Sequence, residues 1–164
     1  MHIDAFNVLI TVEAMLGGAY LIVGRDSAYR DIDPVQGTYR IAHQTTPALH
    51  RLADTLHALN VASGVWHLDR SVSNVGRVKE GLAAVSSERG QSWRLVEETD
   101  VDEALCAVSA PIVTSDSAIL DASGAWLPLE AMVHAQHIPD ANVVDLRPDG
   151  ERASWPPVCG ASRD

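Results

Sequence analysis

Four aspartates stand where apolar runs end or where a helix is expected to begin. Asp4 lies in the opening apolar run, Asp69 and Asp116 each follow another such run, and Asp102 opens a helical stretch. In a parallel α/β sheet, ligands bind outside the carboxyl ends of the strands, so acids at these ends converge from distant parts of the chain. A cluster of like charges is costly unless a cation neutralises it, and oxygen ligands suit Mg2+ or Mn2+. The sequence therefore predicts a divalent-metal site formed by Asp4, Asp69, Asp102 and Asp116.

Each of these aspartates also has a purely structural interpretation. A buried aspartate is rare unless it is paired or coordinating, which favours metal ligation by Asp4 over an internal hydrogen bond. Asp116 could instead cap the short helix expected after it. Asp102 could be a first-turn acid favoured by the helix dipole, with Asp100 as the substitute. Asp69 could belong to an ordinary loop.

Three further polar residues are candidates for binding the phosphate of a substrate. Asn7 could hold the first acid, reach a phosphate or cap the first helix. Ser73 and Asn74 belong to a polar loop that follows a core strand and precedes a helix, which is a place where anions bind and equally a normal connection. Glu13 has no assigned role, and neither has Asp31.

A repeat of histidines every seven residues, at His43, His50 and His57, could place at least two of them on one helix face. This spacing indicates a partly exposed face or a partner interface rather than a zinc site, which prefers pairs four residues apart. The histidine face and an exposed hairpin predict that the chain could form a homodimer.

The elements that would position these residues alternate along the chain. We expect strands at residues 2–6, 20–23, 28–32, 61–68, 93–97, 111–115 and 142–146. We expect helices at residues 8–16, 77–89, 101–108 and 127–135, with a turn or short helix at 116–122. We expect a further helix that is capped by Thr45 or Thr46, has Pro47 in its first turn and extends to Leu59. The turn residues 24–27 predict that the second and third strands form a small hairpin.

This alternation predicts an α/β fold, a three-layer α/β/α sandwich with a mainly parallel sheet of about five strands. We expect one domain over residues 1–147 and a flexible C-terminal tail over 148–164, which is rich in proline and glycine.

Composition excludes several classes of protein. The chain has 164 residues and no apolar run long enough for a membrane helix, so we expect no membrane association. Its two cysteines form no disulfide framework, which favours the cytoplasm. The net charge of −10 argues against avid, non-specific binding to duplex nucleic acid, although arginines could still line one local groove.

The order and spacing of the motifs resemble those of the PIN-like and NYN nuclease superfamily. Such domains open with a strand that ends in aspartate, often with asparagine three residues later, as at Asp4 and Asn7. They carry a second acid after the second strand, where Asp69 stands. A third acid opens a helix before the fourth strand, as at Asp102, and that strand ends in a Thr/Ser-x-Asp pattern, as at residues 114–116.

Residues 3–13, followed by Tyr29-Arg30-Asp31, are similar to an uncharacterised prokaryotic PIN-like family. Members of that family have a glycine-serine loop where this chain has residues 71–76. The resemblance covers residues 2–146 and implies a PIN-like domain.

The resemblance implies a metal-dependent phosphodiesterase, with single-stranded RNA as the substrate and Mg2+ or Mn2+ as the cofactor. Its catalytic and metal-binding residues would be Asp4, Asp69, Asp102 and Asp116. Asn7, Ser73 and Asn74 would bind the phosphate, and Arg40, Arg70 or Arg77 could contact the nucleic-acid backbone.

Two other functions compete with this one. The first is a catalytically inactive PIN-like module that binds nucleic acid or protein, with its acids retained as caps. The second is a metal-dependent phosphatase on a similar sheet. Against the phosphatase, Phe6 stands where an aspartyl-phosphate enzyme has the second acid of its Asp-x-Asp pair.

Overall fold

The computed structural model describes residues 1–32 and 39–148. Within these ranges the elements follow one another in the order β1 (His2–Asp4), α1 (Ala5–Leu16), β2 (Leu21–Val23), β3 (Tyr29–Asp31), α2 (Thr45–Ala58), β4 (Ser63–Asp69), α3 (Val75–Glu88), β5 (Ser92–Glu98), α4 (Val101–Cys106), β6 (Ile112–Val113), α5 (Ser117–Ala122), α6 (Leu129–His137) and β7 (Val143–Asp145). Apart from Pro148, the tail predicted over 148–164 lies outside the described residues. No helix in the described part of the chain is both long and apolar enough to span a membrane.

The larger sheet has four strands in the order β5-β4-β1-β6, and all of its pairings are parallel. Asp4 of β1 pairs in register with His67 of β4, and Ile3 pairs with both Trp66 and Val113. The carboxyl ends of the strands therefore meet at one edge of the sheet, as the alternating pattern predicted. The α/β class with a mainly parallel sheet is confirmed.

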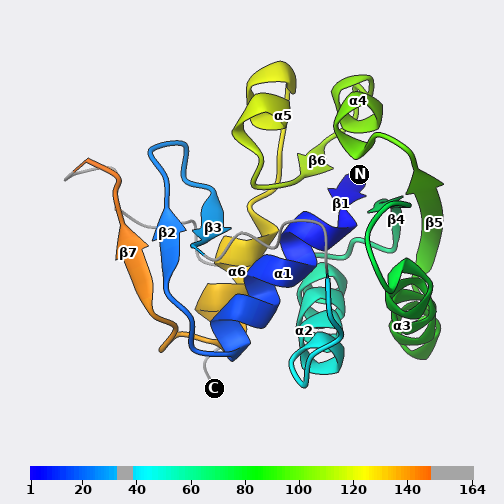
Figure 1. Ribbon diagram of the computed structural model, residues 1–164, viewed down its shortest axis with the longest axis horizontal. Helices are drawn as coiled ribbons and strands as arrows, with labels where there is room; N and C mark the ends of the chain where they lie inside the picture. The colour runs from blue at the N-terminus through cyan, green and yellow to red at the C-terminus, as the bar shows by residue number, and fades with distance from the viewer. Residues whose placement is uncertain (33–38, 149–164) are drawn as a thin grey trace.

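A second sheet has three strands in the order β3-β2-β7 (Figure 1). Strands β2 and β3 are antiparallel, which confirms the predicted hairpin, whereas β7 is parallel to β2. The prediction of one sheet of about five strands was therefore wrong in this respect, because the last strand pairs with β2 and not with the larger sheet.

The outer edge of β6 explains where β7 goes. Trp126 forms a parallel bridge with Ile112, the Ile112 N–H donates to the Ala125 carbonyl, and the Leu127 N–H donates to the Ile112 carbonyl. The edge of β6 is thus already hydrogen-bonded by a non-strand segment, which blocks a further strand there. The same pairing explains why α6 begins at Leu129 and not at 127 as predicted.

The two faces of the larger sheet bury different apolar clusters. Ile3, Trp66 and Val113 belong to the main core, which α1, α2, α3 and α6 complete. Ile112 points to the other face and packs with Val101 and the residues of a smaller cluster from α4 and α5. Alternating side chains of the strands thus serve both faces, which is the pattern of a sheet between helices.

Helix α1 lies between the two sheets and contacts β1 and β4 on one side and β2 and β3 on the other (Figure 1). Two predicted boundaries were wrong near helix starts. Strand β1 ends at Asp4 and not at residue 6, because the Asp4 side chain caps a helix that begins at Ala5. Helix α2 begins at Thr45, after Gln44, and the Thr45 hydroxyl is bonded to Glu13 and Tyr39 instead of serving as a cap.

A candidate acidic site at the ends of the parallel strands

Asp4 is both the last residue of β1 and the N-cap of α1. Its Oδ1 accepts a hydrogen bond from the Asn7 N–H at 3.3 Å, and its Oδ2 accepts one from the Thr114 hydroxyl at 3.1 Å. The residue is 8% exposed. Burial is the main reason that the pKa of Asp4 is raised to about 7. The two hydrogen bonds lower this pKa, and the charges of Asp102 and Asp116 raise it.

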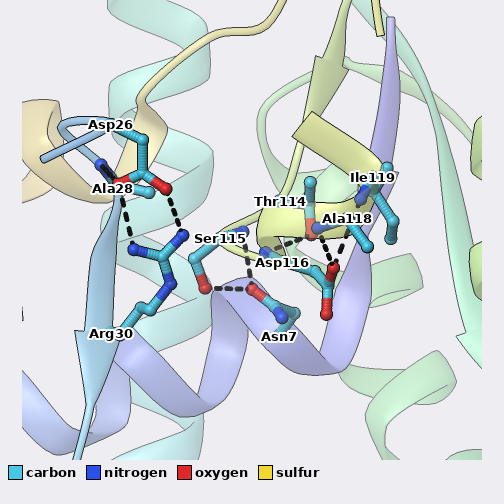
Figure 2. A network of polar contacts seen from close by, with 9 residues as sticks. All are labelled: Asn7, Asp26, Ala28, Arg30, Thr114, Ser115, Asp116, Ala118 and Ile119. Atoms are coloured by element: carbon cyan, nitrogen blue, oxygen red, sulfur yellow. Dashed lines mark hydrogen bonds and ion pairs between the residues drawn. The ribbon is translucent and has the colours of Figure 1, made fainter. Parts of the chain in front are cut away.

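Asp116 follows β6 and is the N-cap of α5 (Figure 2). Its Oδ1 accepts hydrogen bonds from the backbone N–H groups of Ala118 and Ile119, at 2.7 and 3.2 Å. Its own N–H donates to the Thr114 hydroxyl, which in turn donates to Asp4. The capping alternative is therefore realised for Asp116, and the second carboxyl oxygen has no hydrogen-bond partner in the described part of the chain.

Asn7 connects the start of α1 to the segment after β6. Its Oδ1 accepts hydrogen bonds from both the N–H and the hydroxyl of Ser115, the N–H at 2.8 Å (Figure 2). A backbone N–H can only donate, so the amide oxygen must face Ser115 and the amide NH2 must point elsewhere. Asn7 is not the helix cap, because Asp4 has that role.

Asp102 and Asp69 complete the acidic cluster at its outer side. Asp102 is exposed in the first turn of α4, after the N-cap Asp100. Burial raises the pKa of Asp102, and the charges of Asp116, Asp100 and Asp69 raise it further. Asp69 ends β4, and its Oδ1 accepts a hydrogen bond from the Ser71 N–H at 2.7 Å.

Asp102 is thus linked through its charge to each of the other three predicted acids. The links run from Asp4 to Asp102 and Asp116, and from Asp102 to Asp116 and Asp69. Within residues 1–32 and 39–148, no three side chains of histidine, cysteine, aspartate or glutamate are placed to hold one metal ion together. A Mg2+ ion that uses one or two carboxylates and keeps several waters needs no such group, and the oxygen chemistry of the cluster fits it.

A cleft of about 330 Å³ opens beside Asp116 and is lined by Asn7, residues 30–32 and residues 115–117. Its basic group is Arg30 of β3, whose Nη1 and Nη2 donate to the two carboxyl oxygens of Asp26 at 3.0 and 2.5 Å (Figure 2). Arg30 was not among the arginines that the sequence suggested. Arginine in a strand followed by aspartate gives no local signal of a cleft, because the contact comes from the packing of β3 against α1.

Ser73 and Asn74 lie apart from this cleft, in the loop between β4 and α3. Asn74 has a left-handed backbone with φ of 65°, and its amide nitrogen donates to the Tyr39 carbonyl at 2.9 Å. That bond gives Asn74 a role in holding the loop. The structure therefore brings Asn7 to the cleft beside Asp116 and leaves Ser73 and Asn74 outside that cleft.

Glu130 of α6 is a fifth acid that sequence reasoning missed. It is 2% exposed, and burial raises its pKa to about 7, with a further rise from the charge of Asp4 and a reduction from Arg30. A signal was present in the sequence, because Glu130 lies three residues before Val133 and beside Leu129, on the apolar stripe of its helix.

Comparison with known proteins adds a family but no activity. Over 92 residues the chain is 35% identical to an uncharacterized protein (MJ0935) of Methanocaldococcus jannaschii, a match that covers 54% of this chain. The chain spans less than half of that relative, 44% of its length. No solved structure matches the chain. The family match extends over residues 1–132, which include all five acids and Asn7. The chain belongs to the family described as "Domain of unknown function (DUF5616)".

Proposed function

We propose that this chain is a metal-dependent phosphodiesterase of PIN-like type, acting as a ribonuclease on single-stranded RNA. One observation carries the proposal. Asp102 and Asp116 act through their charges on the buried carboxyl of Asp4, and Asp69 at the end of β4 acts on Asp102. Burial of a carboxyl among like charges is unfavourable in the free protein, and a divalent cation would reverse that balance.

The acids have distinct roles in this proposal. Asp4 and Asp116 would hold Mg2+ or Mn2+. Asp102 and Asp69 would act through water molecules, from the start of α4 and the end of β4. The ion, when bound, would supply Lewis-acid chemistry that lowers the pKa of a water molecule and stabilises charge on the phosphate. Asp116 can contribute its second oxygen without losing the helix cap, because both capping bonds use Oδ1.

Asn7 and Arg30 are suited to bind the phosphate backbone. The amide NH2 of Asn7 faces away from Ser115 and, among the described residues, has no hydrogen-bond partner, so it can donate to a phosphate oxygen. Arg30 lines the same cleft and carries a guanidinium group, which matches phosphate oxygens in shape and charge. Its pairing with Asp26 fixes its position at the rim of the cleft.

A catalytically inactive binding module remains the second candidate, and a specific observation favours it. Asp69 and Asp116 both use a carboxyl oxygen for local backbone hydrogen bonds, at 2.7 Å to Ser71 and Ala118. An acid retained only for such a bond needs no metal. The two candidates differ in whether these carboxylates can be exchanged for amides without loss of function, since asparagine caps a helix about as well as aspartate.

A cleavage assay separates the candidates. Labelled single-stranded RNA of mixed sequence is incubated with Mn2+ and wild type, Asp4→Asn, Asp116→Asn or the control Asp121→Asn. Asp121 is exposed on α5, outside the acidic cluster. We expect Asp4→Asn and Asp116→Asn to lower the cleavage rate at least about 100-fold, since metal ligation supplies several kcal/mol of transition-state stabilisation. Asp121→Asn should cleave as wild type does.

Two results would contradict the proposal. Cleavage that survives both substitutions would place the activity elsewhere. Absence of cleavage in wild type, combined with RNA binding that both substitutions leave unchanged, would favour the inactive module. Circular dichroism of each variant controls for folding, because Asp4 and Asp116 are also helix caps.

A further inference from the structure

Glu130 presents a buried carboxyl group, and one of its two oxygens has no hydrogen-bond partner in the described part of the chain. The residue is 2% exposed, and its Oε1 is buried without a hydrogen bond among the described residues. An unpaired buried polar group is destabilising, and a buried carboxylate more so. An apolar residue at this position of α6 would continue the buried stripe of Leu129 and Val133 without that penalty. A glutamate at this position is destabilising unless another group compensates for the burial of its carboxyl.

The charged groups that act on Glu130 are Asp4 and Arg30. The Arg30 guanidinium pairs with Asp26, and no hydrogen bond or ion pair joins Arg30 to Glu130 among the described residues. The two oxygens of Asp4 accept hydrogen bonds from Asn7 and Thr114, and no hydrogen bond joins Asp4 to Glu130 in the described part of the chain. The charged groups that influence Glu130 are therefore a second acid, Asp4, and an arginine, Arg30, that is paired with another carboxylate.

Helix α6 packs against α1, whose first turn is capped by Asp4. Glu130 is buried and interacts with Asp4 through its charge, whereas Asp102 and Asp116 belong to α4 and to the start of α5. The second carboxyl that a hard cation would need beside Asp4 is therefore available without any of the exposed acids.

We propose that Glu130 belongs to the cation site, where its carboxylate and that of Asp4 bind one divalent ion directly or through a water molecule. This inference rests on the proposed function, because it adds a residue to the metal site of that function. Glu130 acts here as a ligand or as a group that positions a ligand, and it has no assigned contact with RNA.

The test measures binding of Mn2+ alone to the full chain, without RNA, by calorimetry and by the shift in melting temperature. The variants are Glu130→Gln, Asp4→Asn and the control Asp121→Asn. We expect Glu130→Gln to weaken Mn2+ binding at least about tenfold, the range for groups that support a metal site. We also expect Glu130→Gln to melt at a higher temperature than wild type without metal. Asp121→Asn should bind Mn2+ as wild type does.

Three outcomes bear on the proposal in different ways. Unchanged Mn2+ affinity in Glu130→Gln overturns it, even if Asp4→Asn abolishes both Mn2+ binding and RNA cleavage, in which case the proposed function stands. A lower melting temperature with unchanged affinity also overturns it and assigns Glu130 to a structural contact with Arg30. Weaker Mn2+ binding in a protein that never cleaves RNA supports the cation site and contradicts the phosphodiesterase.

A second variant guards against misfolding of Glu130→Gln. Glu130→Asp keeps the charge and shortens the side chain by one methylene group. We expect its Mn2+ affinity to lie between those of wild type and Asp4→Asn. An affinity equal to that of wild type in both Glu130→Asp and a folded Glu130→Gln would contradict the role of Glu130.

Discussion

A single amide joins the two parts of the chain that form the cleft. Asn7 belongs to the first turn of α1, and Ser115 follows β6 more than a hundred residues later. The Asn7 oxygen satisfies both polar hydrogens of the buried Ser115, so the two segments are held in one orientation. The chemistry of the cleft therefore depends on an interaction that stabilises the fold at the same time.

We expect replacement of the Asn7 amide to lower the stability of the protein. Asn7→Ala leaves the N–H and hydroxyl of buried Ser115 without partners, and we expect it to lower the free energy of unfolding by about 1–3 kcal/mol. Urea unfolding measures the change. The control is Asn142→Ala, because the amide of exposed Asn142 makes one hydrogen bond, to the Gly18 carbonyl. Equal effects of the two substitutions would show that the Asn7 contact has no special weight.

Among the secondary-structure elements, the β2–β3 hairpin presents Arg30 to the cleft. A methyl group at Gly24 would stand 2.5 Å from both Arg30 Nη1 and Asp26 Oδ1. The tight packing of this turn therefore fixes the ion pair that holds Arg30 in place. The hairpin was recognisable in the sequence, but this packing was not.

Gly24→Ala tests the hairpin as an element of the site. We expect the added methyl group to separate Arg30 from Asp26 and to raise KM for RNA several-fold while kcat changes little, because Arg30 is assigned to backbone binding. Gly124→Ala is the matched control, since a methyl group there meets no atom within 4 Å. A loss of kcat with unchanged KM would contradict the role given to Arg30.

The sequence predicted those parts of the fold that local pattern determines. Alternation of apolar runs located the strands of the larger sheet, and the turn residues 24–27 located the hairpin. It could not place β7, because the edge of β6 is closed by Trp126 and its neighbours, which carry no strand pattern. It extended β1 past Asp4 because the apolar residues of α1 continue directly from those of the strand.

Some residues of the candidate site could likewise be predicted from the sequence, and others could not. Asp4, Asp69 and Asp116 could be located because each follows an apolar run at the same edge of a parallel sheet. Arg30 and Glu130 could not, because the hairpin places Arg30 in the cleft beside Asp116 and α6 places Glu130 within the influence of Asp4, both through packing against α1. Those contacts join segments more than 25 residues away from Asp4, and no local spacing reports them.

For the molecule as a whole, α1 is the part that both sheets share. Its N-terminus begins at the acidic cluster, and its body packs against the hairpin and against the larger sheet (Figure 1). Two carboxyls near this N-terminus, those of Asp4 and Glu130, are the buried acids whose pKa values are raised to about 7. Their ionisation affects the stability of the entire fold.

The sign of the pH dependence follows from these pKa values. The folded state holds the protons of Asp4 and Glu130 up to about pH 7, whereas in the unfolded state these groups release them near their ordinary values of 3.8 and 4.5. Stability is therefore fully present at low pH and is lost as the pH rises through about 7. In EDTA, we expect the free energy of unfolding to fall between pH 5 and pH 8 by on the order of 2 kcal/mol per group.

Urea unfolding at several pH values measures this loss. The variant Asp4→Asn/Glu130→Gln has no carboxyl at either position and should show a much flatter profile over the same range. A free energy of unfolding that rises from pH 5 to pH 8 in the wild type would contradict the prediction.

The direct passage from β1 to α1 limits how this protein can change during evolution or design. Asp4 is the final residue of the strand and the cap of the helix, so no connecting loop separates them. One residue inserted between Asp4 and Ala5 would turn the helix by about 100° and carry Asn7 away from Ser115. The candidate site therefore depends on a β1–α1 junction at which no residue can be inserted.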